Sequence, residues 1–435
     1  MLKNQRLFLH IIANQILSGT ATSFVWFALI FWAFLETDSI LVTSLIAGIF
    51  GITNAITAFP FGWMVDHYKK KSVLLISSSL STLSFIGAYF LLTGMPESSF
   101  QNISSPVLWI LIIILLFGSI AGNLRMICLN PIVSMLFEAD ERAKQNGLIG
   151  VSNGISFTLT SVLSGLSIGL LGMEITLLLA ISALSLSIVY LSFIPIPELK
   201  LQENAPNKLD TPEEKTSTLK LIRNTSGFIG LMLFAILNNL LGGVFMALMD
   251  AYGLSLVSVE SWGFLWGLLS LVTIVGGMVA TKYGIGKDPV KTLILLNLFT
   301  WISCILFPLK ASIVLLGLGG IVWMFCFPIV ETAEQTIIQK VIPIQQQGRV
   351  VGLMQSLENA IAPLTSLLIG PITAFWIVPF MTTGKGAEWI GSWFGTGQDR
   401  AMALVFIMAG VLGTLLSVGS YFSKTRKKIT ALYQS

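Results

Sequence analysis

Polar residues divide the chain into twelve long apolar runs, each with very few charges. A helix needs about 20 residues to cross a hydrocarbon core of about 30 Å, whereas membrane β-strands are about half as long and alternate in polarity. The runs have helical length and do not alternate. We therefore predict an all-α integral membrane protein with transmembrane helices at about residues 9–35, 40–65, 73–94, 106–130, 147–172, 175–195, 226–250, 261–281, 290–309, 312–338, 350–380 and 401–422.

One long polar stretch interrupts this pattern, between the sixth and the seventh run. It is rich in proline and charge and has no apolar period, which is typical of a linker. The first run follows Lys3 and Arg6, as a signal peptide would, but it is too long and has no clear cleavage site, so we expect an uncleaved helix. The predicted parts are a six-helix bundle at 1–195, a linker at 196–225, a second six-helix bundle at 226–422 and a basic tail at 423–435.

The composition supports a membrane protein and excludes several other classes. Hydrophobic residues make up 54% of the 435, charged residues only 11%, and the mean hydropathy is +0.84. About 25% of residues are charged in an ordinary globular protein, so a soluble enzyme, a disordered chain or a nucleic-acid binder is not expected. The cysteines, Cys128, Cys304 and Cys326, lie in apolar runs without metal-ligand spacing. We expect contact with membrane lipid, no nucleic acid, no metal and no cofactor.

The basic residues predict the orientation. With the N-terminus inside the cell, 21 of the 25 Lys and Arg residues fall in cytoplasmic segments, and only Lys310, Lys385 and Arg400 fall outside. Arg125 lies within a span. Cytoplasmic loops carry an excess of positive charge, and the opposite orientation would invert this ratio. We therefore predict a multi-pass protein of the cell membrane with a cytoplasmic linker and both termini in the cytoplasm.

A weak internal repeat supports two related halves. Asn130-Pro131-Ile132-Val133 in the fourth helix resembles Phe327-Pro328-Ile329-Val330 in the tenth, about 200 residues later. One short match in apolar sequence is weak evidence alone, but it falls on the corresponding helix of each half. The pattern favours two pseudo-symmetric bundles related by an axis along the membrane normal.

The loop between the second and third helices carries Gly62, Asp66, Lys70 and Lys71. Gly62 permits close helix packing, Asp66 is an acid at the membrane edge, and the lysines fit the headgroup layer. The loop resembles the Gly-x-x-x-Asp-x-x-Gly-basic-basic motif of the major facilitator superfamily, with Lys69 at the second glycine. The resemblance implies a twelve-helix secondary transporter that works by alternating access, with these four residues as a conformational switch. An ordinary positive loop is the alternative.

Two further segments resemble the macrolide-efflux and siderophore-exporter branch of that superfamily. They are residues 13–18 in the first helix and, around the tenth and eleventh helices, Gln335-Thr336, Pro343 and residues 348–350. This resemblance implies an antiporter that exports amphipathic organic compounds in exchange for protons, as in multidrug resistance. We expect the protein to be a monomer. A helix-5 Gly-Pro motif of many drug–proton antiporters is missing from residues 150–172. A dedicated exporter of a siderophore or lipid-like metabolite and a nutrient symporter remain alternatives.

Ionisable residues inside the spans are the first functional candidates, because a central charge costs about 2.5–3.5 kcal/mol on insertion scales. They are Arg125, Glu331, Glu334 and Glu358. Glu331, Glu334 and Gln335 share one helix face, and we expect this face to look into a cavity with Arg125 opposite, where a carboxyl could carry the coupled proton. As alternatives, Glu334 is a solvated helix end, and Glu331 and Glu358 make static ion pairs or packing hydrogen bonds.

Neutral polar and aromatic residues are the candidates for a substrate cavity. Amides, hydroxyls and rings suit a bulky amphipathic small molecule better than a sugar or a small anion. Each of these residues could instead join neighbouring helices. The candidates are Asn14, Gln15, Ser18, Trp26, Asn238, Asn239 and Trp323.

Two other functional classes have little support in the sequence. A membrane-embedded enzyme would need converging acid, base and nucleophile or metal ligands, and the chain has no HExxH, GxSxG or P-loop pattern. A channel would be expected to show a ring of like residues or a re-entrant filter loop, and neither is evident. We therefore expect a transporter without enzymatic activity and without direct use of ATP.

Overall fold

The computed structural model describes residues 2–196 and 220–434, without the side chains of residues 2–3, 66, 130, 134, 139–144, 146–147, 150, 281, 344–349 and 352. Most of the predicted linker, residues 197–219, lies outside the described residues. All regular elements of the described parts are helices. They are α1 (Leu2–Thr37), α2 (Ile40–His67), α3 (Lys70–Gly94), α4 (Ser98–Gln101), α5 (Pro106–Leu136), α6 (Ala139–Ser192), α8 (Phe228–Leu256), α9 (Val259–Tyr283), α10 (Pro289–Leu306), η1 (Phe307–Leu309), α11 (Ile313–Val341), α12 (Ile344–Ile372), η2 (Thr373–Ile377), α13 (Val378–Thr382), α14 (Lys385–Phe394), α15 (Gln398–Phe422) and α16 (Lys424–Gln434).

The predicted all-helical membrane fold is confirmed. Eleven helices in the described residues are long and apolar enough to cross a membrane. One of them, α6, has 54 residues, more than twice the about 20 residues that one crossing needs. It contains two of the predicted spans, 147–172 and 175–195. The eleven helices therefore contain all twelve predicted spans.

Gly172 separates these two spans. Its φ of 76° and ψ of 175° are not helical and lie in a region that residues with a side chain rarely adopt. The sequence therefore turns between the fifth and the sixth span at a residue without a Cβ atom.

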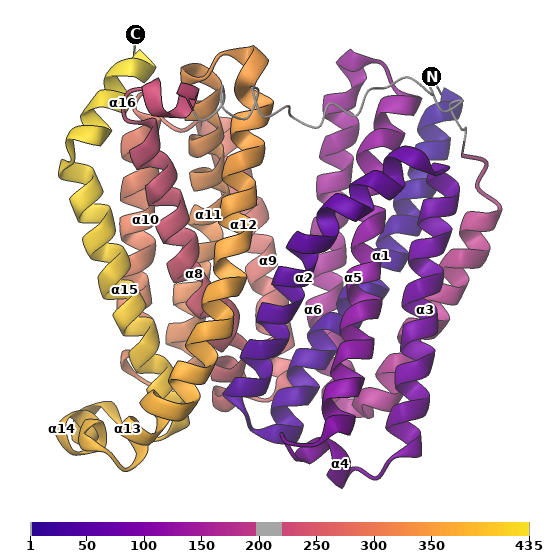
Figure 1. Cartoon of the computed structure of the whole chain (residues 1–435), viewed down its shortest axis with the longest axis horizontal. Helices are drawn as coiled ribbons and strands as arrows, with labels where there is room; N and C mark the ends of the chain where they lie inside the picture. Colours follow the sequence, from indigo (N-terminus) through magenta and orange to yellow (C-terminus); the bar gives the residue numbers. More distant parts are fainter. Residues whose placement is uncertain (1, 197–219, 435) are drawn as a thin grey trace. The chain divides into compact units, whose positions relative to one another are not determined.

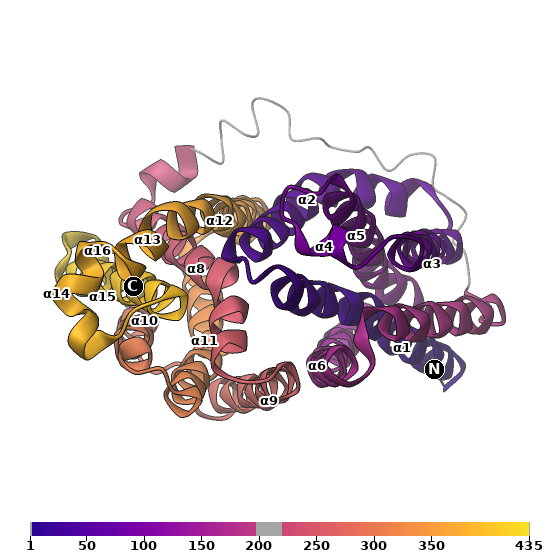
Figure 2. The same cartoon turned by 90° about the horizontal axis from the view of Figure 1, so that it is seen from below.

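The chain forms two compact units. One comprises Met1–Ala205 with Val257–Ser270, and the other Pro206–Leu256 with Leu271–Ser435. In the first unit α1 packs on α6, and α3 packs on α5 and α6, as the side view and the end-on view both show (Figures 1 and 2). The domain boundaries given above remain predictions.

Small polar residues join the helices of the first unit. Ser77 Oγ donates a hydrogen bond of 2.7 Å to the carbonyl of Ala121, and Ser81 Oγ donates one of 2.7 Å to that of Gly118, so α3 is tied to α5. Short side chains allow helix backbones to approach closely, and in lipid this packing replaces the hydrophobic drive available in water.

Aromatic packing is prominent in the second unit, where α8 lies against α12 and α15, and α10 against α11 and α15. Phe406 of α15 is central. Its ring centroid lies 4.9 Å from that of Phe245, 5.5 Å from that of Tyr252 and 5.6 Å from that of Phe307. These rings fill the space between α8, η1 and α15.

The structure modifies two details of the sequence analysis. The predicted span 350–380 is divided into α12, the π-helical η2 and α13, with Pro363 and Pro371 inside α12. The prolines of the weak repeat lie at different depths: Pro131 is five residues from the end of α5, whereas Pro328 is thirteen from the end of α11. The repeated tetrapeptide therefore does not mark equivalent positions in the two halves.

Candidate functional site

Arg125 of α5 is almost fully buried in the first unit, with 1% of its surface exposed. Its guanidinium donates to Asn14 Oδ1 at 2.5 Å and to Gln15 Oε1 at 3.1 Å, both on α1. It also donates to Ser78 Oγ at 2.8 Å and to the carbonyl of Leu74 at 3.3 Å, both on α3. Four oxygen atoms from two neighbouring helices thus stabilise a charge that the apolar interior would otherwise exclude.

The partners of Arg125 are held in turn by further contacts. Asn14 Nδ2 donates to the carbonyl of Ser187 on α6 at 2.8 Å, and Gln15 Nε2 contacts Met126 Sδ at 3.1 Å. Ser18 Oγ lies 3.4 Å from Ser78 Oγ. Asn14, Gln15 and Ser18 are all buried, so in this unit they link helices around the arginine. We still predict, without a test from the structure, that these three residues line a substrate cavity.

A separate cavity of about 140 Å³ lies within the second unit. Its walls come from α8, α10 and α11, and it brings together five of the predicted site residues. These five are Asn238, Asn239, Trp323, Glu331 and Glu334. Trp26, another predicted candidate, lies in the first unit and stacks on Phe50 with ring centroids 3.8 Å apart.

The amide side chains of this cavity use their N–H groups within their own helices. Asn238 Nδ2 donates to the carbonyl of Phe234 at 2.7 Å, Asn239 Nδ2 to that of Ala235 at 3.2 Å, and Asn297 Nδ2 to that of Leu293 at 2.9 Å. The carbonyl oxygens of Asn239 and Asn297 have no partner among the described residues. The cavity therefore offers hydrogen-bond acceptors to a ligand.

Carboxyl groups add to this acceptor character. Glu331 and Glu334 line the cavity, and Glu358 of α12 interacts directly with the Glu334 side chain. The Oε1 atom of Glu358 is buried without a hydrogen-bond partner. Within the described residues, no ion pair joins any of the three to a lysine or arginine. Neighbouring carboxylates repel each other, and a bound proton or cation removes that repulsion.

Both units contain further residues that line the cavity or hold Arg125 and that were not predicted from the sequence. Asn297, Thr300 and Trp301 of α10 line the cavity, and Trp301 Nε1 donates to Asn238 Oδ1 at 2.7 Å. Their i, i+3, i+4 spacing on one helix face was an available signal. Ser78, which holds Arg125, gave a weaker signal within a run of serines.

The loop between α2 and α3 consists of only Tyr68 and Lys69. Lys69 has φ −57° and ψ 130°, so this short turn needs no glycine there. Lys70 Nζ donates to the carbonyl of Val65, and Lys71 Nζ to that of Ser192 at 2.8 Å. No described atom outside its own helix lies within 4 Å of a Cβ built on Gly62, so close packing at Gly62 is not seen within the described residues. The Asp66 side chain lies outside the described residues.

Side chains that bind metals do not cluster in the described parts of the chain. No group of three or more His, Cys, Asp and Glu side chains in these parts of the chain could hold a metal ion.

Comparison with known proteins shows the fold in several transporters. The crystal structure of the nucleoside transporter NupG aligns with 96% of this chain and 100% of its own, with a TM-score of 0.70 at 12% identity. The peptide transporter POT, in complex with sulfate, aligns with 97% of this chain and 95% of its own (TM-score 0.66, 11% identity). The D-xylose-proton symporter aligns with 97% of this chain and 98% of its own (TM-score 0.64, 13% identity).

Sequence comparison gives a family and one relative. An uncharacterized transporter of Buchnera aphidicola subsp. Baizongia pistaciae (strain Bp) is 30% identical over 171 residues, which span 39% of this chain and 39% of that protein. The family model of the Major Facilitator Superfamily matches residues 11–367. The chain therefore belongs to the Major Facilitator Superfamily and is a multi-pass membrane transporter rather than an enzyme.

Proposed function

We propose that this transporter works by alternating access and exports amphipathic organic compounds in exchange for protons. The observation that carries the proposal is the acceptor-rich cavity, in which asparagine carbonyls and two glutamates lie beside Trp301 and Trp323. Such a lining favours a ligand with N–H or O–H donors and an apolar ring, and it disfavours an anion.

The volume of the cavity limits what it can hold. Whole drug-sized ligands occupy pockets of about 300–1,000 Å³, whereas this cavity has about 140 Å³. It suits one ring or amine group of a ligand. Binding of a cationic group beside Glu331 and Glu334 would compete with protons for the same carboxyls, which is a simple physical basis for exchange.

The proposal includes an orientation and a switch. Both termini are cytoplasmic, because 21 of 25 basic residues then lie on that side of the membrane. Gly62, Asp66, Lys70 and Lys71 act as the conformational switch, as the superfamily motif implies. We further propose that the protein acts as a monomer in the cell membrane.

A nutrient symporter is the second candidate. It is favoured by polar groups beside tryptophans in the cavity, which also suit a ligand with several hydroxyl groups, and the structural neighbours include a protein described as a D-xylose-proton symporter. A dedicated exporter of a siderophore or a lipid-like metabolite would share the export direction but accept few other compounds.

Accumulation of a panel of dyes and macrolides in expressing cells, with and without a protonophore, tests the proposal. For proton-driven export, we expect the expressing cells to accumulate less of the compound, and we expect the protonophore to restore accumulation to the level of control cells. Increased accumulation of any compound would indicate import, and no change across the panel would exclude broad drug export.

Glutamine substitutions then test the coupling role. We expect Glu331→Gln and Glu334→Gln to reduce energised export at least tenfold, because the amide cannot carry the exchanged proton. Glu388→Gln is the matched control, since Glu388 is exposed on α14, outside the cavity. Unchanged export in both cavity variants would remove these residues from the coupling mechanism.

A further inference from the structure

A groove of about 300 Å³ lies in the second unit between α8, α10, α15 and α16. Most of its wall is apolar, including Leu233, Leu237 and Leu415, which are themselves exposed. Exposed leucines on transmembrane helices face lipid, so the groove opens toward the acyl chains of the bilayer.

The polar groups of the groove are gathered at one end. Ser420, Ser423, Thr425 and Arg426 all lie where α15 ends and α16 begins. The groove is thus apolar along the helices and polar at their end, which matches the polarity of a phospholipid, with its acyl chain and its phosphate.

Charge favours an anionic occupant at this end. Three segments lie at the ends of the helices that meet α16: residues 220–229 before and at the start of α8, residues 284–292 at the start of α10, and residues 420–434 at the end of α15 and in α16. Together they contain eight lysines and arginines but a single acid, Asp288. Lys424, Lys427 and Lys428 are exposed on α16, and none of them forms an ion pair with a described residue. Basic residues close to a membrane surface attract anionic lipids by about 1 kcal/mol each.

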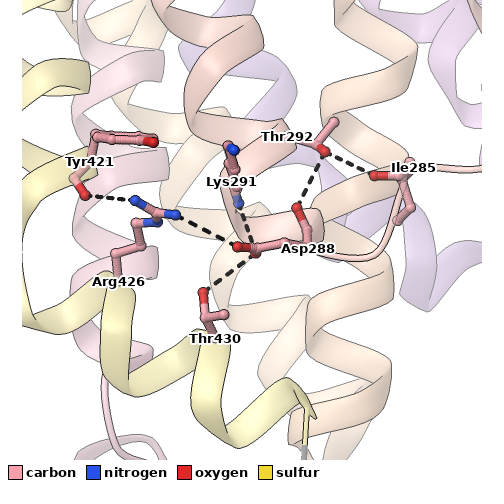
Figure 3. A network of polar contacts seen from close by, with 7 residues as sticks. All are labelled: Ile285, Asp288, Lys291, Thr292, Tyr421, Arg426 and Thr430. Atoms are coloured by element: carbon pink, nitrogen blue, oxygen red, sulfur yellow. Dashed lines mark hydrogen bonds and ion pairs between the residues drawn. The ribbon is translucent and has the colours of Figure 1, made fainter.

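The polar end is held in place by contacts of α16 with α10. Arg426 Nη2 lies 3.6 Å from Asp288 Oδ2, and Thr430 Oγ1 lies 3.4 Å from Asp288 Oδ1, which also accepts the backbone N–H of Lys291 at 3.0 Å (Figure 3). Arg426 Nη1 donates to the carbonyl of Tyr421 at 3.0 Å. A guanidinium has five N–H groups, so it can hold α16 and still donate to a phosphate.

Apolar and close contacts complete the attachment of α16. Ile429 is 1% exposed and belongs to the hydrophobic core of the second unit. A Cβ on Gly230 would collide with the Thr425 side chain, so α16 lies directly against α8. This helix is therefore a fixed wall of the groove.

We propose that this groove binds one anionic glycerophospholipid. An acyl chain lies along the leucines of α8 and α15, and the phosphate lies at the hydroxyls of Ser420 and Thr425 beside Arg426. The Ser423 hydroxyl instead donates to the carbonyl of Ser420 at 2.8 Å and accepts the backbone N–H of Arg426 at 3.1 Å, which fixes the start of α16. This site is separate from the cavity of the proposed transport function and does not depend on it.

Gly419 offers a sharp test, because it lines the groove and a Cβ on it would meet no atom within 4 Å. Gly419→Trp therefore starts its side chain in open space and puts a bulky indole into the groove. Gly87→Trp is the matched control, since Gly87 is an exposed glycine inside α3 with equally open surroundings. The charge variant is Lys424→Gln, Lys427→Gln and Lys428→Gln combined, which alters exposed side chains only.

The measurement is native mass spectrometry of the full chain after equilibration with equal amounts of phosphatidylglycerol and phosphatidylcholine. We expect wild type and Gly87→Trp to retain one phosphatidylglycerol, and Gly419→Trp to retain at least tenfold less. The lysine variant should keep a bound lipid but lose about tenfold or more of its preference for phosphatidylglycerol. Equal retention by Gly419→Trp and wild type, an absence of lipid preference in wild type, or equally tight binding of glycerol phosphate without acyl chains would overturn the proposal.

Discussion

The polar cluster around Arg125 in the first unit and the polar cavity in the second unit differ in how their groups are paired. In the first, Arg125 supplies hydrogen-bond donors, and oxygens of α1 and α3 accept them. In the second, asparagine oxygens and the carboxyls of Glu331 and Glu334 offer acceptors, and the described residues supply them with few donors. The first arrangement is internally satisfied and suits a structural role. The second is left open to a proton or a ligand.

This comparison gives an ordered set of expectations for stability. A satisfied buried network should be sensitive to loss of any member, because the remaining groups become unpaired away from water. An open acceptor site should tolerate neutralisation of a carboxyl, because a glutamine can still contact Glu358 and no described lysine or arginine loses an ion pair.

The largest effect is expected for Arg125→Met. Asn14, Gln15 and Ser78 would lose their donor, and each unpaired buried group costs about 1–3 kcal/mol, so a loss of about 3 kcal/mol or more is expected. Thermal unfolding of the purified protein measures it. Arg223→Met, at an exposed position, is the control. An unchanged unfolding midpoint for Arg125→Met would contradict a structural role for the network.

Ser78→Ala should have the next largest effect. It removes the 2.8 Å hydrogen bond to Arg125, and hydrogen bonds to charged groups contribute about 1.5–3 kcal/mol. The adjacent Ser79 has no such bond and makes Ser79→Ala a matched control in the same thermal unfolding assay. If the two variants have the same unfolding midpoint, Ser78 does not stabilise Arg125.

A smaller effect is expected for Trp301→Phe in the second unit. The change removes the donor to Asn238 Oδ1, which is worth about 0.5–1.5 kcal/mol. Trp323→Phe makes the same change in the same cavity, at an indole whose N–H has no partner among the described residues. The difference between the unfolding midpoints of the two variants reports the hydrogen bond together with the tighter packing of the buried Trp301, and no difference would argue against the hydrogen bond.

Glu334→Gln should have the smallest effect on stability. An amide keeps the shape of the side chain and removes the repulsion from Glu358 and Glu331, so we expect a change of no more than about 0.5 kcal/mol, or a slight gain. Thermal unfolding measures this as well. A loss comparable to that of Arg125→Met would show that the two units do not differ in the way described.

Part of the candidate site could be predicted from sequence because charges and amides are conspicuous in apolar helices. Glu331 and Glu334 share a helix face by their spacing, and the structure places both on one cavity with Asn238 and Asn239. The spacing of Asn297, Thr300 and Trp301 places them on one face of a helix, but the donation from Trp301 to Asn238 depends on how α10 meets α8 and could not be predicted.

The sequence by itself determined the membrane fold. A run of about 20 apolar residues must satisfy its backbone hydrogen bonds internally in lipid, so length and hydropathy are enough to predict a spanning helix. α6 follows the same rule, because hydropathy and length predict its two spans without knowledge of the turn at Gly172.

Only the tertiary structure decided which helix faces meet. In water, an apolar stripe marks the buried face of a helix, but in lipid the outer face is apolar too, so periodicity does not show what packs against what. Arg125 therefore could not be matched with Asn14, Gln15 and Ser78 from sequence, although each residue is visible there. Their pairing depends on contacts between α1, α3 and α5, and the chain does not encode these contacts in any local pattern.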